Sequence, residues 1–394
     1  VLKGLGGKPM KSEPCLYMWH DSRGNLTMLC STHVDDFKIT GEQSTVEKVI
    51  KGLEIQVGKL KQETTEFEHC GIKHRQLSNK DVVIHQNHYV DQLKAIPMSK
   101  EWNLEALCTP ADSASYMSLL GGVAWVVNTR TDIAIFVGAL QRVAKSPKYV
   151  DIKRLNTVLR FLKRHPIETT FKKLTGPLKL VAISDSAFKR QDESPLACRG
   201  SLLALSTDAP NQPGGDIHVI DYQSKKQKRV TRSTYGAEIH GLADTMEAAR
   251  TIACAFTELY TGTKTFDQLA KLEDNGNYYY PIDACLDAKS VFDSIIAADL
   301  KTPSEASLVN ILGQMREHMA CRRIRTLYWI DTRDMLADGL NKGAISRKPL
   351  MQALVQGIWR VIHPPVSYTH LRAHETREDR GGRGGVGKKK GGGG

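Results

Sequence analysis

The sequence predicts a mixed protein of the α/β (α+β) class, built from hairpins, then helices, then alternating strands and helices. Three observations predict it. Residues 15–97 show apolar alternation broken by turn residues, residues 113–166 show apolar stripes at helical spacing, and residues 179–354 alternate the two patterns. The 394 residues are too many for one small core. We therefore expect units at 1–112, 113–178 and 179–355, followed by a tail at 356–394.

The first unit should contain two hairpins and a helix. LYMWHDSRGNLTMLCSTHVDDFKIT supplies two apolar strands around a turn at residues 21–25. Apolar residues then recur at helical spacing in VEKVIKGLEIQV, after Ser44 or Thr45, either of which can cap a helix. FEHCGIKHRQLS and DVVIHQNHYV predict the second hairpin, with its turn at residues 79–81.

The second unit should be helical, since SYMSLLGGVAWVVN, TDIAIFVGALQRVAKS and YVDIKRLNTVLRFLKRHP all carry apolar stripes. In the third unit, LKLVAISDSAF, CRGSLLALS and HVIDYQSKKQ predict three strands, and TYGAEIHGLADTMEAARTIACAFTELY predicts a long helix. YPIDACLDAKSVFDSII reads as a strand running into a helix, and RIRTLYWIDT as a strand before the helix MLADGLNK. This order predicts a mixed sheet with helices packed on its faces.

Composition narrows the class of protein. The net charge of +12 suits a polyanionic partner such as nucleic acid. No apolar run approaches the ~18 residues of a membrane span, and VLKGLGGKPMKSEP lacks the apolar core of a signal peptide. The eight cysteines are scattered singly, which favours reduced thiols in a protein that is not secreted. The initial Val indicates a piece of a longer protein.

The tail at 356–394 has a different composition. SYTHLRAHETREDRGGRGGVGKKKGGGG contains too few apolar residues to bury a core, so we expect a disordered segment. It also resembles the translated read-through of a sequencing-library adaptor, and we therefore treat it as a candidate artefact without a function.

Four carboxylates form the main candidate site. Asp185 ends the strand LVAIS, Asp287 ends IDACL, Glu238 lies on the long helix, and Asp338 begins the last helix. Two strands and two helices would bring them to one edge of a sheet, as two metal ions ~4 Å apart require. All-carboxylate ligation favours Mg²⁺, with Mn²⁺ as a substitute, over Zn²⁺. Each acid alone is more often a cap or a surface residue, and other acids compete for the role: Asp244, Asp283, Asp293, Asp331 and Asp334.

Asp35 and Asp36 are a second candidate metal site. Adjacent acids at a hairpin tip are usually turn residues, but this pair lies between apolar stretches and is followed by a helix. His33, two residues earlier, is less convincing as a base or a ligand.

Two basic segments are candidate nucleic-acid surfaces. One precedes the Glu238 helix, where cations can hold phosphates and hydroxyls can contact sugars; an exposed turn is the alternative. Its candidate binding residues are Lys225, Lys226, Lys228, Arg229, Arg232 and Ser233. The other runs along the predicted helices from Arg142 to Arg164, where a solvated helix face is an equal alternative to a surface that tracks phosphates.

The chain resembles the Pol polyproteins of copia-type LTR retrotransposons over residues 1–355. Ten motifs occur in the order of that family: KSEPCLYM, HVDDFKITG, FEHCGIK, LCTPAD, YMSLLGGVAWVVNTRTDIAIFVGAL, LKRHP, SDSAF, YQSKKQKRVTRSTYGAEIHGLA, LDAKSVFDSI and LADGLNK. The resemblance implies the C-terminal part of a reverse-transcriptase palm and thumb at 1–112, a helical connection at 113–178 and an RNase H-like domain at 179–355.

The resemblance also implies a function. Asp185, Glu238, Asp287 and Asp338 correspond to the family's metal ligands for Mg²⁺-dependent hydrolysis of RNA in RNA–DNA hybrids. One acid of Asp35-Asp36 would correspond to a polymerase ligand. The implied partners are the hybrid, other parts of the polyprotein or a second copy. The implied locations are a cytoplasmic virus-like particle and, as a second compartment, the nucleus.

Departures from the family pattern keep alternatives open. The polymerase needs a third aspartate and the fingers, which would precede Val1, so RNA-directed DNA polymerase activity is expected only of the intact parent. His33 stands where the family has an aromatic residue, Tyr235-Gly236 precedes Ala237-Glu238, and an insertion spans residues 208–216. These features are typical of decay, so a non-enzymatic nucleic-acid-binding remnant is the alternative function.

Overall fold

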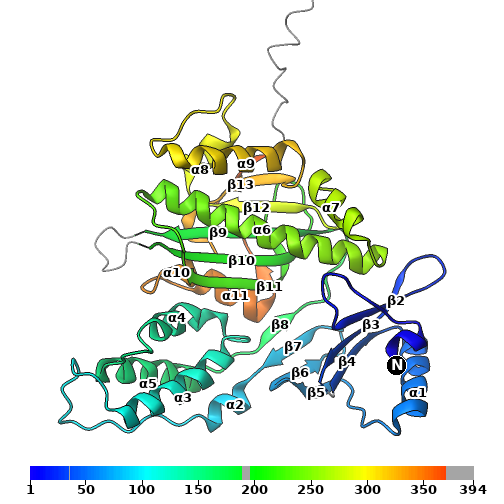
Figure 1. The fold of residues 1–394 in the computed structure, drawn as a ribbon, viewed down its shortest axis with the longest axis horizontal. Helices are drawn as coiled ribbons and strands as arrows, with labels where there is room; N and C mark the ends of the chain where they lie inside the picture. The colour runs from blue at the N-terminus through cyan, green and yellow to red at the C-terminus, as the bar shows by residue number, and fades with distance from the viewer. Residues whose placement is uncertain (35, 189–195, 370–394) are drawn as a thin grey trace, which may run out of the picture.

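Three β-sheets organise this computed structural model, which describes residues 1–34, 36–188 and 196–369 (Figure 1). The first sheet has the order β1-β2-β3-β4 and is antiparallel throughout. Its strands are β1 (Lys8–Pro9), β2 (Leu16–His20), β3 (Leu26–His33) and β4 (Asp36–Gly41). The short helix η1 (Leu2–Leu5) and helix α1 (Gln43–Val57) cover it around Trp19, Met28 and Leu53. The first predicted hairpin and the predicted helix are both confirmed.

The second sheet, β5-β6-β7-β8, joins segments far apart in sequence. Strands β5 (Glu66–His69), β6 (Ile72–Gln76) and β7 (Val82–His85) are consecutive, whereas β8 (Thr169–Phe171) follows the helical region. Between them lie α2 (Asn87–Gln92), α3 (Pro110–Val126), η2 (Thr131–Ile133), α4 (Ala134–Arg142) and α5 (Tyr149–Arg164). These helices pack around Tyr116, Ile152 and Leu155, as their apolar stripes predicted. The helical region is thus an insertion between two paired strands of the second sheet.

The third sheet has seven strands in the order β14-β11-β10-β9-β12-β13-β15. Its strands are β9 (Leu178–Ala187), β10 (Cys198–Thr207), β11 (Gly215–Lys226), β12 (Ile282–Leu286), β13 (Thr326–Trp329), β14 (Ile358–Trp359) and β15 (Val366–Tyr368). Only the β9–β12 and β12–β13 pairs are parallel among these described strands. The predicted mixed sheet is confirmed.

Helices cover both faces of this sheet, which explains why β9 and β12 are buried almost throughout. One face packs against α6 (Thr234–Thr261), α8 (Lys289–Ile296) and α9 (Val309–Ala320), with α7 (Phe266–Asn275) beside them. The other packs against α10 (Asp338–Asn341) and α11 (Lys348–Gln356). The short helices η3 (Ala306–Leu308) and η4 (Thr332–Asp334) complete the unit. Helix α4 lies against α10 and β11, so the helical region borders the sheet directly (Figure 1).

The ordered sheet continues past residue 355, where the sequence predicted a tail without a core. Strand β14 pairs with β11, and β15 pairs with β13. Trp359 is buried, and its indole Nε1 donates to the Asp334 carbonyl. The prediction of disorder is therefore wrong for these two strands. Trp359, Val361 and Tyr368 pack against the cores of the existing sheet, and this packing with a few backbone pairs suffices to extend it. The predicted tail beyond residue 369 lies outside the described residues.

The N-terminal sheet is tied to the end of α6. The buried carboxylate of Glu258 accepts hydrogen bonds from the backbone N–H of Lys11 (2.6 Å) and of Ser12 (3.1 Å), and from the Ser12 hydroxyl (2.9 Å). Met10 and Met18 pack against Leu259 beside this contact. The helix that carries Glu238 is thus anchored at its far end by the first unit.

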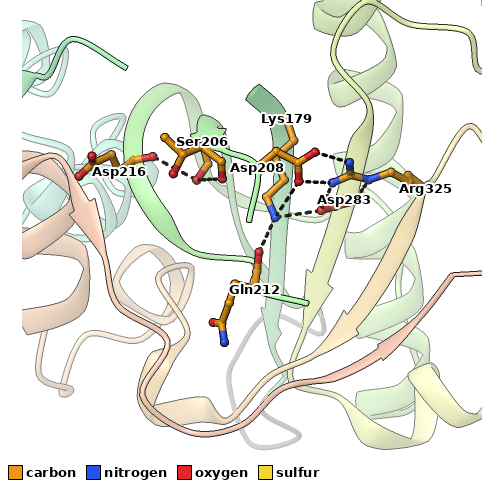
Figure 2. A network of polar contacts seen from close by, with 8 residues as sticks. Lys179, Ser206, Asp208, Gln212, Asp216, Asp283 and Arg325 are labelled. Carbon is orange, nitrogen blue, oxygen red and sulfur yellow. Dashed lines mark hydrogen bonds and ion pairs between the residues drawn. The ribbon is translucent and has the colours of Figure 1, made fainter. Parts of the chain in front are cut away.

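A network of charges closes one end of the large sheet (Figure 2). The buried Lys179 lies 3.1 Å from Asp283, and Arg325 contacts both Asp283 (2.7 Å) and Asp208 (2.6 Å). Lys179 also donates to the Gln212 carbonyl. Residues 208–216, which the sequence suggested were a sign of decay, therefore supply partners to two cations.

Candidate metal centre

Four predicted site residues lie at the opposite end of the same strands. Strands β9 and β12 are parallel neighbours with Ile183 opposite Cys285, so Asp185 and Asp287 emerge at the same level. Helix α6 crosses β9 and brings Glu238 toward them, while α10 begins at Asp338.

Three of these acids lie close enough to share a metal ion. One carboxylate oxygen from each of Asp185, Glu238 and Asp287 lies within 4.8 Å of the others. Among residues 1–34, 36–188 and 196–369, this is the one such group of three or more His, Cys, Asp or Glu side chains. The fourth acid, Asp338, hydrogen-bonds to Asp185 rather than joining the three. Of the four predicted acids, Asp185, Glu238 and Asp287 thus form one group, here called the trio, and Asp338 lies beside it against Asp185.

Two glycines permit this close approach. Gly200 lies opposite Asp185 on β10, and a Cβ there would come within 2.5 Å of the Ala337 carbonyl. Gly241, one turn after Glu238, would place a Cβ 2.3 Å from the Ser186 hydroxyl. A side chain at position 200 would push the start of α10 away from β10, and one at position 241 would displace the Ser186 hydroxyl next to Asp185.

Burial and mutual repulsion disfavour ionisation of three of the four acids. Burial raises the pKa of Glu238 to about 9, and the charges of Asp185 and Asp287 add to the effect. Burial and Asp185 likewise raise the pKa of Asp287 to about 6 and that of Asp338 to about 7. The protonated Asp338 carboxyl can then donate its hydrogen bond to Asp185. When these carboxyl groups are ionised, their closely spaced negative charges attract a cation strongly.

Asp185 is the exception. Burial alone would raise its pKa, but the hydrogen bond with Asp338 and the charge of Lys342 outweigh burial and hold the pKa below the ordinary value. Lys342 lies 3.1 Å from Asp185 and also donates to Asp338. One buried carboxylate is thus already ionised at neutral pH.

Sequence reasoning missed three residues that hold these acids. The Asn341 amide donates to Asp185 (2.6 Å), and the Thr332 hydroxyl donates to Asp287 (2.9 Å). Lys342 follows Asp338 by four residues on one helix, a spacing that brings opposite charges together and could have revealed it. Asn341 and Thr332 carry no comparable signal, because their roles depend on contacts between distant segments.

The competing acids have partners elsewhere. Asp283 belongs to the network of Figure 2, Asp244 pairs with Arg199, and Asp293 pairs with Lys289 (2.9 Å). Asp331 pairs with Arg333 (2.8 Å), and Asp334 accepts from the backbone N–H groups of residues 362 and 363. Each of these acids has a donor outside the site, whereas the site's one paired lysine among the described residues, Lys342, serves both Asp185 and the flanking Asp338.

The second predicted metal site remains untested. Asp36 begins β4 at an exposed hairpin tip opposite His33, and it belongs to no group of three or more possible metal ligands among the described residues. Its neighbour Asp35 lies outside the described residues.

Most of the predicted nucleic-acid-binding residues are exposed beside the site. Lys225 and Lys226 end β11, while Lys228, Arg229 and Arg232 lie between β11 and α6, and only Lys226 is partly buried. Ser233 has a structural role, because its hydroxyl caps α6 by accepting from the Gly236 N–H (3.0 Å). Between these residues, the buried Gln227 donates to the Ala237 carbonyl (2.7 Å) and holds the segment against the helix.

Two curated relatives are Pol polyproteins of transposons. The retrovirus-related Pol polyprotein from transposon RE2 of Arabidopsis thaliana is 26% identical over 260 residues, which are 63% of this chain and 17% of that protein. The one from transposon RE1 is 28% identical over 148 residues, 38% of this chain and 9% of that protein. The chain is thus similar to copia-type Pol polyproteins over part of its length, and it spans less than a fifth of the length of these relatives.

A third relative is named as an effector protein rather than as a Pol polyprotein. Secreted RxLR effector protein 161 of Plasmopara viticola is 30% identical over 138 residues, which are 34% of this chain and 88% of that protein. Nearly all of that effector is thus similar to about one third of this chain. No protein-family model matches the chain. No helix in the described residues is both long and apolar enough to cross a membrane.

Proposed function

We propose that this chain hydrolyses the RNA strand of RNA–DNA hybrids in a Mg²⁺-dependent reaction. The observation that carries the proposal is the trio Asp185, Glu238 and Asp287, whose oxygens lie within 4.8 Å of one another. The residues suit hard cations, because every donor is a carboxylate and no Cys or His lies in the group. Kinship with Pol polyproteins and the order of strands β9 to β13 support the same reaction.

Asp185, Glu238 and Asp287 would hold the cations, with Asp338 beside them. Mg²⁺, when bound, supplies positive charge that favours ionised water and offsets negative charge on the phosphate. The protein contributes rigid positions: Asn341 orients Asp185, Thr332 orients Asp287, and Lys342 keeps the cluster partly neutral. Because burial raises the pKa of Glu238 and of Asp338, both carboxyl groups would have to ionise to hold a cation.

The exposed cations beside the site are placed to hold the hybrid. Lys225, Lys228 and Arg229 face solvent at the start of the Glu238 helix, so phosphate contacts there would position a strand over the carboxylates. Such contacts read the backbone and the shape of the duplex, so sequence preference should be weak.

Polymerisation would belong to the intact polyprotein. Asp36 lies on an exposed hairpin and belongs to no group of three or more possible metal ligands among the described residues. Primer extension by this chain should therefore be undetectable, and measurable nucleotide incorporation would contradict this assignment.

The test is cleavage of a labelled RNA strand within a hybrid. We expect cutting in Mg²⁺ or Mn²⁺, none in EDTA, and none of the same RNA as a single strand. Binding of the hybrid without cleavage in either metal would favour the alternative function, a decayed nucleic-acid-binding remnant. A ribonuclease contaminant would be recognised by its activity on the single strand.

A further inference from the structure

A cavity of about 570 Å³ lies between α5 of the helical region and α11 of the large sheet. Its walls include the apolar side chains of Phe161 and Met351, and its polar lining is dominated by Arg130, Arg164 and Arg347. Asp132 is the one carboxylate among the residues that line it. Three guanidinium groups thus face a single negative charge.

That carboxylate is already committed to one arginine. The buried Arg130 donates from Nε and Nη2 to the two oxygens of Asp132, each at 2.9 Å, and from Nη1 to the His165 carbonyl (2.8 Å). Neither Arg164 nor Arg347 forms an ion pair within the described residues. The cavity therefore carries a surplus of positive charge from two arginines.

Arg347 is held by backbone carbonyls and an aromatic ring rather than by an ion pair. Its guanidinium lies 4.6 Å from the Phe136 ring centroid, and it donates to the carbonyls of Lys342 (2.9 Å), Gly343 (3.3 Å) and Ile345 (3.4 Å). Its Nε is buried without a hydrogen-bond acceptor in the described part of the chain. Burial lowers the pKa of Arg347 more than the charge of Asp132 raises it, so an anion beside the guanidinium would stabilise its charged form.

The cavity is connected to the carboxylate cluster by one residue. Lys342, whose carbonyl accepts from Arg347, reaches with its own ammonium group to Asp185 and Asp338. A strand lying over the carboxylates would have its backbone near the cavity as well. Planar guanidinium groups bind the paired oxygens of a phosphate more specifically than lysines do.

We infer that this cavity, lined by Arg130, Arg164 and Arg347, binds a backbone phosphate of the nucleic acid whose RNA strand lies over Asp185. The inference rests on the proposed function and assigns part of the substrate surface to the helical region. Arg164 and Arg347 contact the phosphate oxygens, while Arg130 forms the floor with Asp132. Phe161 and Met351 provide an apolar wall for the adjoining sugar.

The experiment compares hybrid binding by the whole chain and two variants across a series of salt concentrations in EDTA, where cleavage is absent. Arg164→Gln removes an exposed cation that lines the cavity. Arg23→Gln is the control, because Arg23 is exposed in the turn between β2 and β3 and lies in neither basic segment nor in the cavity lining. We expect Arg164→Gln to weaken binding roughly tenfold and to lower the slope of log K against log salt by about 1. Arg23→Gln should change neither.

Equal effects of the two variants, or no effect of either, would overturn the inference. Inorganic phosphate provides a second arm: if Arg164 is needed to bind inorganic phosphate but the hybrid slope is unchanged, the cavity takes a free phosphate and the backbone assignment is wrong. The proposed function is judged separately, by cleavage in Mg²⁺. If the hybrid binds through Arg164 but is not cleaved, the cavity assignment stands and the proposed nuclease activity is wrong.

Discussion

Strands β9 and β12 carry charged residues at both ends, and the two ends differ in how those charges are balanced. At one end, Lys179 and Asp283 lie 3.1 Å apart within a network that Arg325 and Asp208 complete (Figure 2). At the other end, Asp185 and Asp287 face Glu238, and Lys342 is the one cation paired with the cluster in the described residues.

One end is therefore a structural site with balanced charges, and the other has fewer positive charges than carboxylates. Two carboxylates with two cations are satisfied by the protein itself, so the network end needs nothing further. Three carboxylates within 4.8 Å, flanked by a fourth, remain under-compensated by one lysine, which is the arrangement that a divalent cation stabilises. The same strands thus have one end that stabilises the fold and one end that is suited to bind metal.

The largest expected effect is on cleavage. Asp185→Asn should lower the rate of RNA cleavage by at least about 10³-fold, because the carboxylate that is ionised before a cation binds is removed from the site that would hold the cations. Asp293→Asn is the control, since Asp293 is an exposed acid paired with Lys289. The assay measures single-turnover cleavage of a hybrid in Mg²⁺. Comparable rates for Asp185→Asn and the wild type would remove Asp185 from the metal site.

At the network end, the largest effect should be on stability. Asp283→Asn should lower the free energy of unfolding by about 3–5 kcal/mol, because it leaves the buried Lys179 without its nearest carboxylate. Denaturant unfolding of the whole chain measures this loss. The double variant with Lys179→Met should recover part of the stability, since it removes the uncompensated charge as well. A loss below about 1 kcal/mol would show that the network is not a stabilising feature.

At the carboxylate end, removing a charge should instead stabilise the metal-free protein. The pKa of Glu238 is raised to about 9, so between the ordinary value and pH 9 the folded state binds more protons than the unfolded state. Stability from this group is therefore full at low pH and is lost as the pH rises toward 9. Glu238→Gln should raise the free energy of unfolding in EDTA by at least about 1 kcal/mol at pH 8, and by less at pH 5.

Addition of Mg²⁺ sharpens that comparison. It should stabilise the wild type at pH 8 but not Glu238→Gln, because binding to the folded state alone shifts the unfolding equilibrium. A variant less stable than the wild type in EDTA at pH 8 would mean that Glu238 is not repelled by its neighbours.

Sequence patterns located most of the fold and the acids, but not their partners. Apolar spacing predicted the helical region, and short apolar runs predicted the strands β9, β10 and β12, because a strand covered on both faces is buried without alternation. It did not predict β14 or β15, which are too short to show a period. Asp185 and Asp287 were identifiable as acids at strand ends. Asp283 lies on β12, just before Asp287, and competed with it as a metal ligand; its contact with Lys179, which the sequence does not show, gives it a structural role instead.

The smallest expected effect concerns the lone cation of the carboxylate end. Lys342→Met removes the ammonium group that Asp185 and Asp338 share, so the metal-free variant should lose about 1 kcal/mol of unfolding free energy. In saturating Mg²⁺ the loss should vanish, because bound cations supply the charge that the lysine provides without them. Lys179→Met is the matched variant at the network end, where Mg²⁺ has no carboxylate cluster to bind and the loss should persist. If Mg²⁺ rescues both variants equally, or neither, the two ends do not differ in the way that their charges indicate.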